Sequence, residues 1–130
     1  MNKVLGIDYG RKKIGLAIAE SDSGLAEPYK VIRFKSEEEA LEKISRVSRG
    51  SRVSRAVVGV SEGKTGEEAR SFGKKLQEKL NIPVEFQDET LTSKEAQRLA
   101  IKAGIKRKKR RKLEDAYAAA LILQAHLDSK

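Results

Sequence analysis

The chain has 130 residues, no cysteine and a formal net charge of +9. This length suits one domain with one core and is too short for two ordinary domains. Without cysteine there is no disulfide, thiolate zinc site or cysteine nucleophile, so oxygen ligands are the available metal chemistry. The apolar stretches are short and the first residues lack a secretory pattern, which predicts a soluble cytoplasmic protein that does not enter a membrane.

Most of the excess charge lies in one basic run. The chain has 28 Lys and Arg residues, and the 21 outside the run nearly balance 19 Asp and Glu. Nucleic acid is the commonest partner of such a patch, and an anionic membrane surface is the weaker option. The alternative is a solvated, mobile loop that only aids solubility. The run consists of Lys106, Arg107, Lys108, Lys109, Arg110, Arg111 and Lys112.

Five short segments have the apolar patterns that are typical of β-strands. They cover residues 3–9, 13–20, 28–34, 55–60 and 83–89. A short turn around Gly10 and Arg11 joins the first two, so these are expected to form a hairpin.

Three helices are expected to begin at capping boxes, in which Ser or Thr precedes Glu by three positions. The boxes are Ser36 with Glu39, Thr65 with Glu68, and Thr92 with Glu95. These helices should end near Arg49, near Asn81 and at Gly104, and a final helix should cover residues 113–127. The order of elements predicts an α/β protein with a mixed sheet, in which an antiparallel meander precedes strands that return parallel.

A carboxylate, Asp8, lies near the end of the apolar first strand. An ionised carboxylate is costly there unless it is paired, hydrogen-bonded or bound to a metal. Strand alternation puts Asp8 on the same face as Val4 and Gly6. The second strand offers Gly15 and Ala17, so small side chains leave space beside Asp8. The alternative is that Asp8 only accepts hydrogen bonds within the following turn.

Other carboxylates end the fifth strand and begin the last helix. Asp88 and Glu89 lie at the sheet edge where open α/β proteins place their sites, and alternation puts them on opposite faces without deciding between them. Asp115 is expected in the first turn of the last helix, where small neighbours would let that turn approach the sheet. The alternative for these acids is that they favour a helix N-terminus through its dipole.

Three carboxylates, no cysteine and a polycationic run together point to a magnesium-type site that handles phosphates. Mg²⁺ prefers a few carboxylates with waters and substrate oxygens. In such sites, two metals roughly 4 Å apart activate the attacking water and stabilise the leaving oxygen of a phosphodiester.

Four motifs and their order resemble the YqgF/RuvX family, the Holliday-junction-resolvase-like proteins of the RNase H fold. The motifs are GIDYGRKKIGLAIAE, VVGV, DETLTS and GIKRKKRRKLEDAYAAALILQ, and the resemblance covers nearly the whole chain. It implies one RNase H-like nuclease domain over residues 1–130, with helices flanking a five-stranded mixed sheet whose first three strands are antiparallel. It also implies Asp8, Glu89 and Asp115 as the catalytic, metal-binding carboxylates.

The resemblance implies a metal-dependent nuclease with Mg²⁺ or Mn²⁺ as cofactor. Its substrate would be a precursor of 16S ribosomal RNA, which we favour, or branched DNA such as a Holliday junction. Symmetric cutting of a junction would require a dimer, so a monomer and a homodimer both stay open. The expected contacts to nucleic acid are Arg11 and Lys12 in the turn and the basic run.

The chain departs from the family pattern beside the expected site. VSEGKTGEEAR follows VVG in place of a Leu-Pro and an Asn-containing loop, and Thr90 replaces an Arg. Glu62 in this segment adds an acid after the fourth strand, as a further candidate ligand or as part of a solvated loop. Asp88 stays the alternative to Glu89.

Two other function classes compete with the nuclease. GVSEGKTG nearly matches a phosphate-binding loop of nucleotide-binding proteins, but one residue is missing between its glycines. The second class is a non-catalytic nucleic-acid-binding factor, against which the intact acids argue. His126, the single histidine, is expected to be a surface or packing residue and not a general base.

Overall fold

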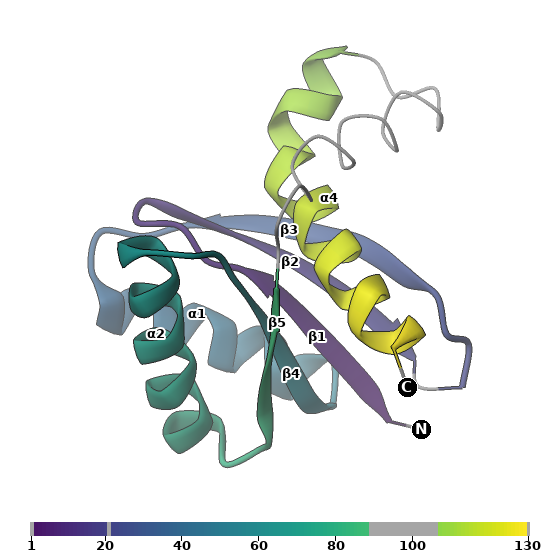
Figure 1. Cartoon of the computed structure of the whole chain (residues 1–130), viewed down its shortest axis with the longest axis horizontal. Helices are drawn as coiled ribbons and strands as arrows, with labels where there is room; N and C mark the ends of the chain where they lie inside the picture. Colours follow the sequence, from purple (N-terminus) through teal and green to yellow (C-terminus); the bar gives the residue numbers. More distant parts are fainter. Residues whose placement is uncertain (1, 21, 89–106, 130) are drawn as a thin grey trace.

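The computed structural model describes residues 2–20, 22–88 and 107–129, with residues 107–112 in backbone only. These parts of the chain form one five-stranded sheet and three helices (Figure 1). The strands are β1 (Lys3–Asp8), β2 (Lys13–Glu20), β3 (Ala26–Arg33), β4 (Val53–Val60) and β5 (Val84–Asp88). The helices are α1 (Glu37–Gly50), α2 (Lys64–Leu80) and α4 (Arg107–Asp128).

The sheet is mixed, with the strand order β3-β2-β1-β4-β5. The strands β1, β2 and β3 form an antiparallel meander, and β4 and β5 continue the sheet in parallel with β1. The predicted α/β class and the antiparallel first three strands are therefore confirmed, and all five predicted strands form. The strand β1 lies at the centre of the sheet, between β2 and β4. Its C-terminal residue, Asp8, therefore lies at the end of the sheet where the parallel strands have their C-termini.

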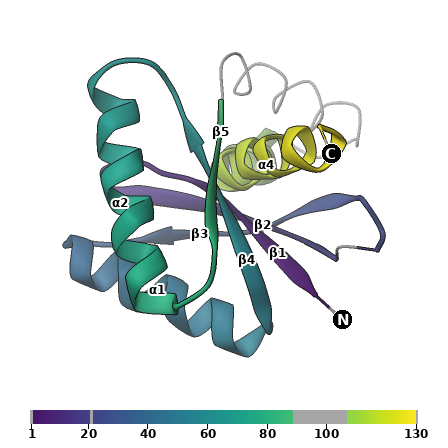
Figure 2. The ribbon, with the colours of Figure 1, turned by 60° about the horizontal axis from the view of Figure 1, so that its bottom comes forward.

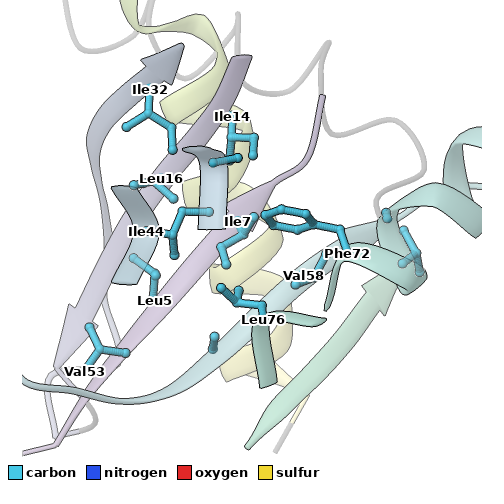
Figure 3. Close-up of a cluster of buried hydrophobic side chains, with 14 residues drawn as sticks. Leu5, Ile7, Ile14, Leu16, Ile32, Ile44, Val53, Val58, Phe72 and Leu76 are labelled. Carbon is cyan, nitrogen blue, oxygen red and sulfur yellow. The ribbon is translucent and has the colours of Figure 1, made fainter. Parts of the chain in front are cut away.

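Helices cover both faces of the sheet (Figure 2). On the face of α1 and α2, large buried side chains from the sheet interdigitate with Ile44, Phe72 and Leu76 from the helices (Figure 3). Figure 3 labels this cluster as Leu5, Ile7, Ile14, Leu16, Ile32, Ile44, Val53, Val58, Phe72 and Leu76. This cluster has more members and larger side chains than the one on the other face, so its burial contributes strongly to the hydrophobic stabilisation.

The face of α4 is packed with smaller side chains. Sheet and helix meet there through a cluster of mainly alanine and valine with a few larger residues. The cluster consists of Val4, Ala17, Ala19, Val57, Ala119, Ala120, Ile122 and Leu123. Small side chains on both surfaces allow the backbone of α4 to lie close to the strands.

The first predicted capping box is confirmed, whereas the second is wrong. The Ser36 side chain accepts a hydrogen bond from the backbone N–H of Glu39 at 3.2 Å and begins α1. The N-cap of α2 is Gly63, with φ of 82° and no side-chain cap, so Thr65 lies inside the first turn. The end of α2 at Asn81, in a left-handed conformation, agrees with the prediction.

The last helix begins six residues earlier than predicted, at Arg107 instead of Leu113. The alternative that the basic run is a loop is therefore wrong for residues 107–112, which form the first turns of α4. Arg and Lys are good helix formers, and no Gly or Pro interrupts the run, so a helix that packs from Ala116 onward continues back through it. The helix expected between Thr92 and Gly104 lies outside the described residues.

In the described parts of the chain, none of the helices combines the length with the apolar character that a membrane span requires.

Candidate active site

Asp8 lies on the face of the sheet that α4 covers. Its neighbours in β1 alternate, because Leu5 and Ile7 belong to the cluster under α1 and α2 whereas Val4 belongs to the cluster under α4. Two-residue alternation puts Asp8 with Val4, as the sequence predicted. In the antiparallel pairing of β1 with β2, Asp8 lies opposite Gly15.

Gly15 brings Asp115 to this position. A Cβ atom added to Gly15 would lie only 1.9 Å from the backbone carbonyl oxygen of Asp115, so the main chain of α4 touches β2 there. Gly6 in the neighbouring strand β1 has the same role, because a Cβ added there would lie 2.9 Å from the carbonyl oxygen of Ala119 in α4. Two glycines on adjacent strands thus seat α4 so that Asp115 lies beside Asp8.

Asp8 and Asp115 line one open groove of about 450 Å³. The other lining residues are the turn 9–13 and Thr65 in the first turn of α2. Because α4 begins at Arg107, Asp115 lies in its third turn and not in the first turn as predicted. The helix dipole is therefore no explanation for this carboxylate, since its effect is confined to the first turn.

Lys13 contacts one of the two carboxylates. Its Nζ lies 3.1 Å from Oδ2 of Asp115, and both side chains are partly exposed. No local pattern in the sequence indicates this ion pair, because the two residues are far apart in the chain and only the seating of α4 on Gly15 joins them.

Arg11 is paired within the protein. Its guanidinium donates two hydrogen bonds to Glu68, from Nε at 3.0 Å and from Nη2 at 2.9 Å. This bidentate pair ties the β1–β2 turn to α2, and the hydrogen bonds from Arg11 lower the pKa of the Glu68 carboxyl. The Glu68 side chain is thus engaged by Arg11, and the predicted box with Thr65 fails because α2 already begins after Gly63. The expected contact of Arg11 with nucleic acid stays a prediction.

Tyr9 follows Asp8 and packs on the other side of the sheet. Its ring lies against Phe72, with the centroids 4.8 Å apart. Burial raises the pKa of the Tyr9 hydroxyl, and the nearby carboxylates of Glu37 and Glu68 raise it further. Tyr9 therefore remains neutral at physiological pH.

The register of β5 separates Asp88 from Asp8. Asp88 pairs with Val60 of β4, and Val60 belongs to the cluster under α1 and α2. Partners in a parallel pair share a face, so Asp88 lies on the opposite face from Asp8. Glu89, Thr90 and Lys106 lie outside the described residues.

Glu62 is exposed in the loop between β4 and α2. Across residues 2–20, 22–88 and 107–129, no three His, Cys, Asp or Glu side chains come together as a metal site would require. The two carboxylates in the groove are hard oxygen donors, which fits a site that is completed by further oxygen ligands.

The segment that nearly matches a phosphate-binding loop is closed by its own backbone. A Cβ added to Gly66 in the first turn of α2 would lie 1.7 Å from the carbonyl oxygen of Ser61. A carbonyl oxygen thus faces the turn where a phosphate-binding loop presents backbone N–H groups. This packing speaks against the nucleotide-binding alternative.

His126 is buried, at 8% relative exposure, and its Nε2 contacts the Glu85 carboxylate. Glu85 lies in β5, so this contact ties the end of α4 to the edge of the sheet. Of the two expected roles, surface residue or packing residue, the structure confirms that His126 is a packing residue.

Comparison with known proteins places these features in a family. A family model described as "RuvX: Holliday junction resolvase" matches residues 2–129. A protein of Caldanaerobacter subterraneus named "Putative pre-16S rRNA nuclease" is 42% identical over 98% of this chain and 97% of its own length. One of the same name from Pelotomaculum thermopropionicum is 41% identical over 98% of this chain and 88% of its own length.

Solved structures share the fold at low sequence identity. Thermus thermophilus RuvC in complex with a Holliday junction substrate aligns with a TM-score of 0.67 and 18% identity, covering 99% of this chain and 95% of that one. Fowlpox virus resolvase with Holliday junction DNA aligns with a TM-score of 0.67 and 13% identity, covering 98% of this chain and 97% of that one. The RNase H-like fold is therefore confirmed.

Proposed function

Because the chain belongs to the RuvX family, we propose that it is a nuclease that hydrolyses phosphodiester bonds in a precursor of 16S ribosomal RNA with the help of Mg²⁺ or Mn²⁺. The observation that carries the proposal is the juxtaposition of Asp8 and Asp115 in one open groove on the α4 face of the sheet. In this proposal, residues 1–130 act as one nuclease domain in the cytoplasm, where precursor ribosomal RNA is processed.

The carboxylates of Asp8, Asp115 and Glu89 would hold the metal. Glu89 is chosen over Asp88 because Asp88 lies on the opposite face of the sheet from the groove. Glu62 is exposed in a loop and does not line the groove, so it is not part of the proposed ligand set. A divalent metal bound there would activate the attacking water and stabilise the leaving oxygen. The protein's part is to fix the two described carboxylates, Asp8 through the β1 pairing and Asp115 through the seat on Gly15.

The basic run and Lys12 would hold the phosphate backbone. Residues 107–112 form the first turns of the helix that carries Asp115, and Figure 1 shows these turns extending beyond the sheet. A cationic helix end that leads to a catalytic carboxylate can position a strand without reading its sequence. Arg11 contributes only if its pair with Glu68 opens.

Cleavage of branched DNA is the second candidate. It is favoured by the description of the family model and by structural neighbours solved with Holliday junctions. A junction nuclease that cuts symmetrically would act as a homodimer, whereas trimming of an RNA precursor requires only a monomer. A purely non-catalytic factor is disfavoured because such a protein has no need for two carboxylates in one groove.

The decisive experiment compares Asp8→Asn with Asp88→Asn. Both changes remove one carboxylate from the C-terminal end of a strand, but only Asp8 lies in the groove. Changing a residue that only hydrogen-bonds to a metal ligand lowers activity roughly 10- to 100-fold. In the presence of Mg²⁺ or Mn²⁺, Asp8→Asn removes a ligand itself and should lower kcat by more than this. Asp88→Asn should retain activity.

Two substrates, a pre-16S RNA fragment and a four-way DNA junction, decide between the candidate functions. Preferential cutting of the RNA supports the proposal, and preferential cutting of the junction replaces it with the second candidate. Thermal unfolding should show no loss of stability for Asp8→Asn, because it removes one of two neighbouring like charges. Cleavage by Asp8→Asn at the wild-type rate would contradict the metal site.

The contribution of the basic run is measured by salt dependence. Replacing Lys108, Lys109, Arg110 and Arg111 with Gln keeps good helix formers while removing charge. The slope of log affinity against log salt should become shallower by roughly 0.7 to 0.9 for each phosphate that the variant no longer neutralises. An unchanged slope would return the run to a role in solubility.

A further inference from the structure

We propose that Lys13 positions Asp115 in the metal-free protein, and that a divalent cation must displace the Lys13 ammonium group from this carboxylate. The inference rests on the metal site proposed above and adds a positioning residue to it. In the groove, the Lys13 ammonium group would then be exchanged for a divalent metal ion.

The placement of Lys13 follows from the pairing of β2. Lys13 is the first residue of this strand, and alternation puts it on the same face as Gly15 and Ala17, under α4. Gly15 has no side chain to keep α4 away from β2, so the helix lies within reach of the Lys13 side chain. Its Nζ lies 3.1 Å from Oδ2 of Asp115.

The contact between Lys13 and Asp115 places a positive charge beside a carboxylate of the groove. Asp8 and Asp115 line the same groove, and carboxylates that share a site repel one another unless a cation lies beside them. Arg11 and Lys12 also line the groove, but Arg11 is paired with Glu68. Lys13 lines the groove too and supplies a positive charge on the side of Asp115. The contact with Lys13 thereby holds the Asp115 carboxylate toward the groove.

The same contact is weak enough to be exchanged. The side chains of Lys13 and Asp115 are 45% and 27% exposed, and ion pairs of this exposure contribute little net stability. Lysine is a hydrated point charge on a flexible stem, so it can withdraw into solvent when another cation takes the carboxylate.

The neighbouring Arg11 shows the contrast. Arg11 makes a bidentate pair with Glu68, a carboxylate in α2 that does not line the groove. Its fixed geometry suits a structural tie between the β1–β2 turn and α2. Lys13 contacts a residue of the groove itself through a point charge on a flexible stem, which suits a group that is released.

The test is calorimetric titration of Mn²⁺ into the full chain and its variants without nucleic acid. Lys13→Met removes the ammonium and keeps an apolar stem, and Lys12→Met makes the same change of net charge at the adjacent exposed residue. Removing the competing cation should tighten Mn²⁺ binding by Lys13→Met about two- to five-fold, which corresponds to the worth of an exposed ion pair. Lys12→Met should change the affinity by a smaller factor, and Lys13→Arg should bind no more tightly than wild type.

Thermal unfolding separates this role from a merely structural one. Without metal, Lys13→Met should unfold at a lower temperature than wild type, and saturating Mn²⁺ should close the difference because the metal then holds Asp115. Lys13→Gln provides a second uncharged variant should Lys13→Met fold poorly.

Unchanged or weaker Mn²⁺ binding by both uncharged variants would overturn the inference, and so would equal tightening in Lys12→Met. The proposed function fails separately: if wild type binds no Mn²⁺, or if Asp8→Asn binds it as tightly as wild type, there is no metal site, and the role of Lys13 falls with it.

Discussion

The two faces of the sheet are built from different side chains. Under α1 and α2, the interface is filled by large residues such as Ile44, Phe72 and Leu76. Under α4, the sheet presents small residues, and at Gly6 and Gly15 the helix backbone itself touches the strands. The first face provides buried area, whereas the second provides close approach.

This difference shows how stability and chemistry are divided in the molecule. A layer of large side chains tolerates small shifts of a helix, because side chains can repack. A helix seated backbone to backbone has one position, and here that position places Asp115 beside Asp8. We therefore expect changes under α1 and α2 to affect mainly stability, and changes under α4 to affect the site.

The largest effect on stability is expected for Leu76→Ala. This side chain is fully buried under α2, so the change should lower the free energy of unfolding by about 2–5 kcal/mol. Denaturant titration measures the loss, and Mn²⁺ titration at a temperature where the variant is folded should give the wild-type affinity. A large loss of Mn²⁺ affinity would mean that the two faces are not independent.

The next largest effect is expected for Gly15→Ala, with Gly73→Ala as its counterpart on the other face. The Cβ added by Gly15→Ala would lie 1.9 Å from a backbone oxygen of α4, so the helix must move, at a cost of about 1–3 kcal/mol and with loss of cleavage. At Gly73, the Cβ would meet the edge of the Phe86 ring at 2.6 Å, and a tilt of the ring together with better helix propensity should keep the change within about 1 kcal/mol. Cleavage by Gly15→Ala at the rate of Gly73→Ala would break the comparison.

A smaller effect is expected for Ser36→Ala, compared with Thr65→Ala. Ser36 caps α1, so its loss should cost about 1 kcal/mol and leave cleavage unchanged. Thr65 is not the N-cap of α2 and lines the groove, so Thr65→Ala should leave the unfolding free energy nearly unchanged. Equal destabilisation by the two changes would restore the capping role that the sequence suggested for Thr65.

The smallest effect is expected for Glu68→Gln. Hydrogen bonds from Arg11 lower the pKa of the Glu68 carboxyl in the folded protein, so the pair stabilises the fold above the unfolded pKa and the gain is lost as pH falls through the folded value. The melting temperature of the variant should be lower than that of wild type at neutral pH, by a few degrees at most, and the difference should close below roughly pH 4. A difference that persists at low pH would show that packing, and not the ion pair, is responsible.

Local patterns in the sequence predicted the fold well. Apolar patterns identified all five strands, alternation identified the face of Asp8, and the Ser36 box identified the start of α1. These features depend on residues that are neighbours in the chain, so spacing alone carries the information. The observed pairing of Asp88 with Val60 puts Asp88 on the face opposite Asp8, which argues against Asp88 as a ligand in the groove.

Contacts between distant segments account for what the sequence did not predict. The Thr65 box was wrong because α2 begins after Gly63, two residues before Thr65. The Glu68 side chain pairs with Arg11, and no local pattern indicates this partner in another element. The contact of Lys13 with Asp115 depends on how α4 lies on the sheet. The early start of α4 shows that the helix propensity of Lys and Arg outweighs the mutual repulsion of their charges in this run.

The site joins the first strand to the last helix, which has a consequence for biosynthesis. Translation produces β1 early and α4 late, so a nascent chain can form the layer under α1 and α2 before Asp115 exists. Until α4 is made, Val4, Ala17 and Val57 have no cover and the groove has no second carboxylate. A nascent chain that does not yet include α4 would therefore lack one of the two carboxylates of the proposed site.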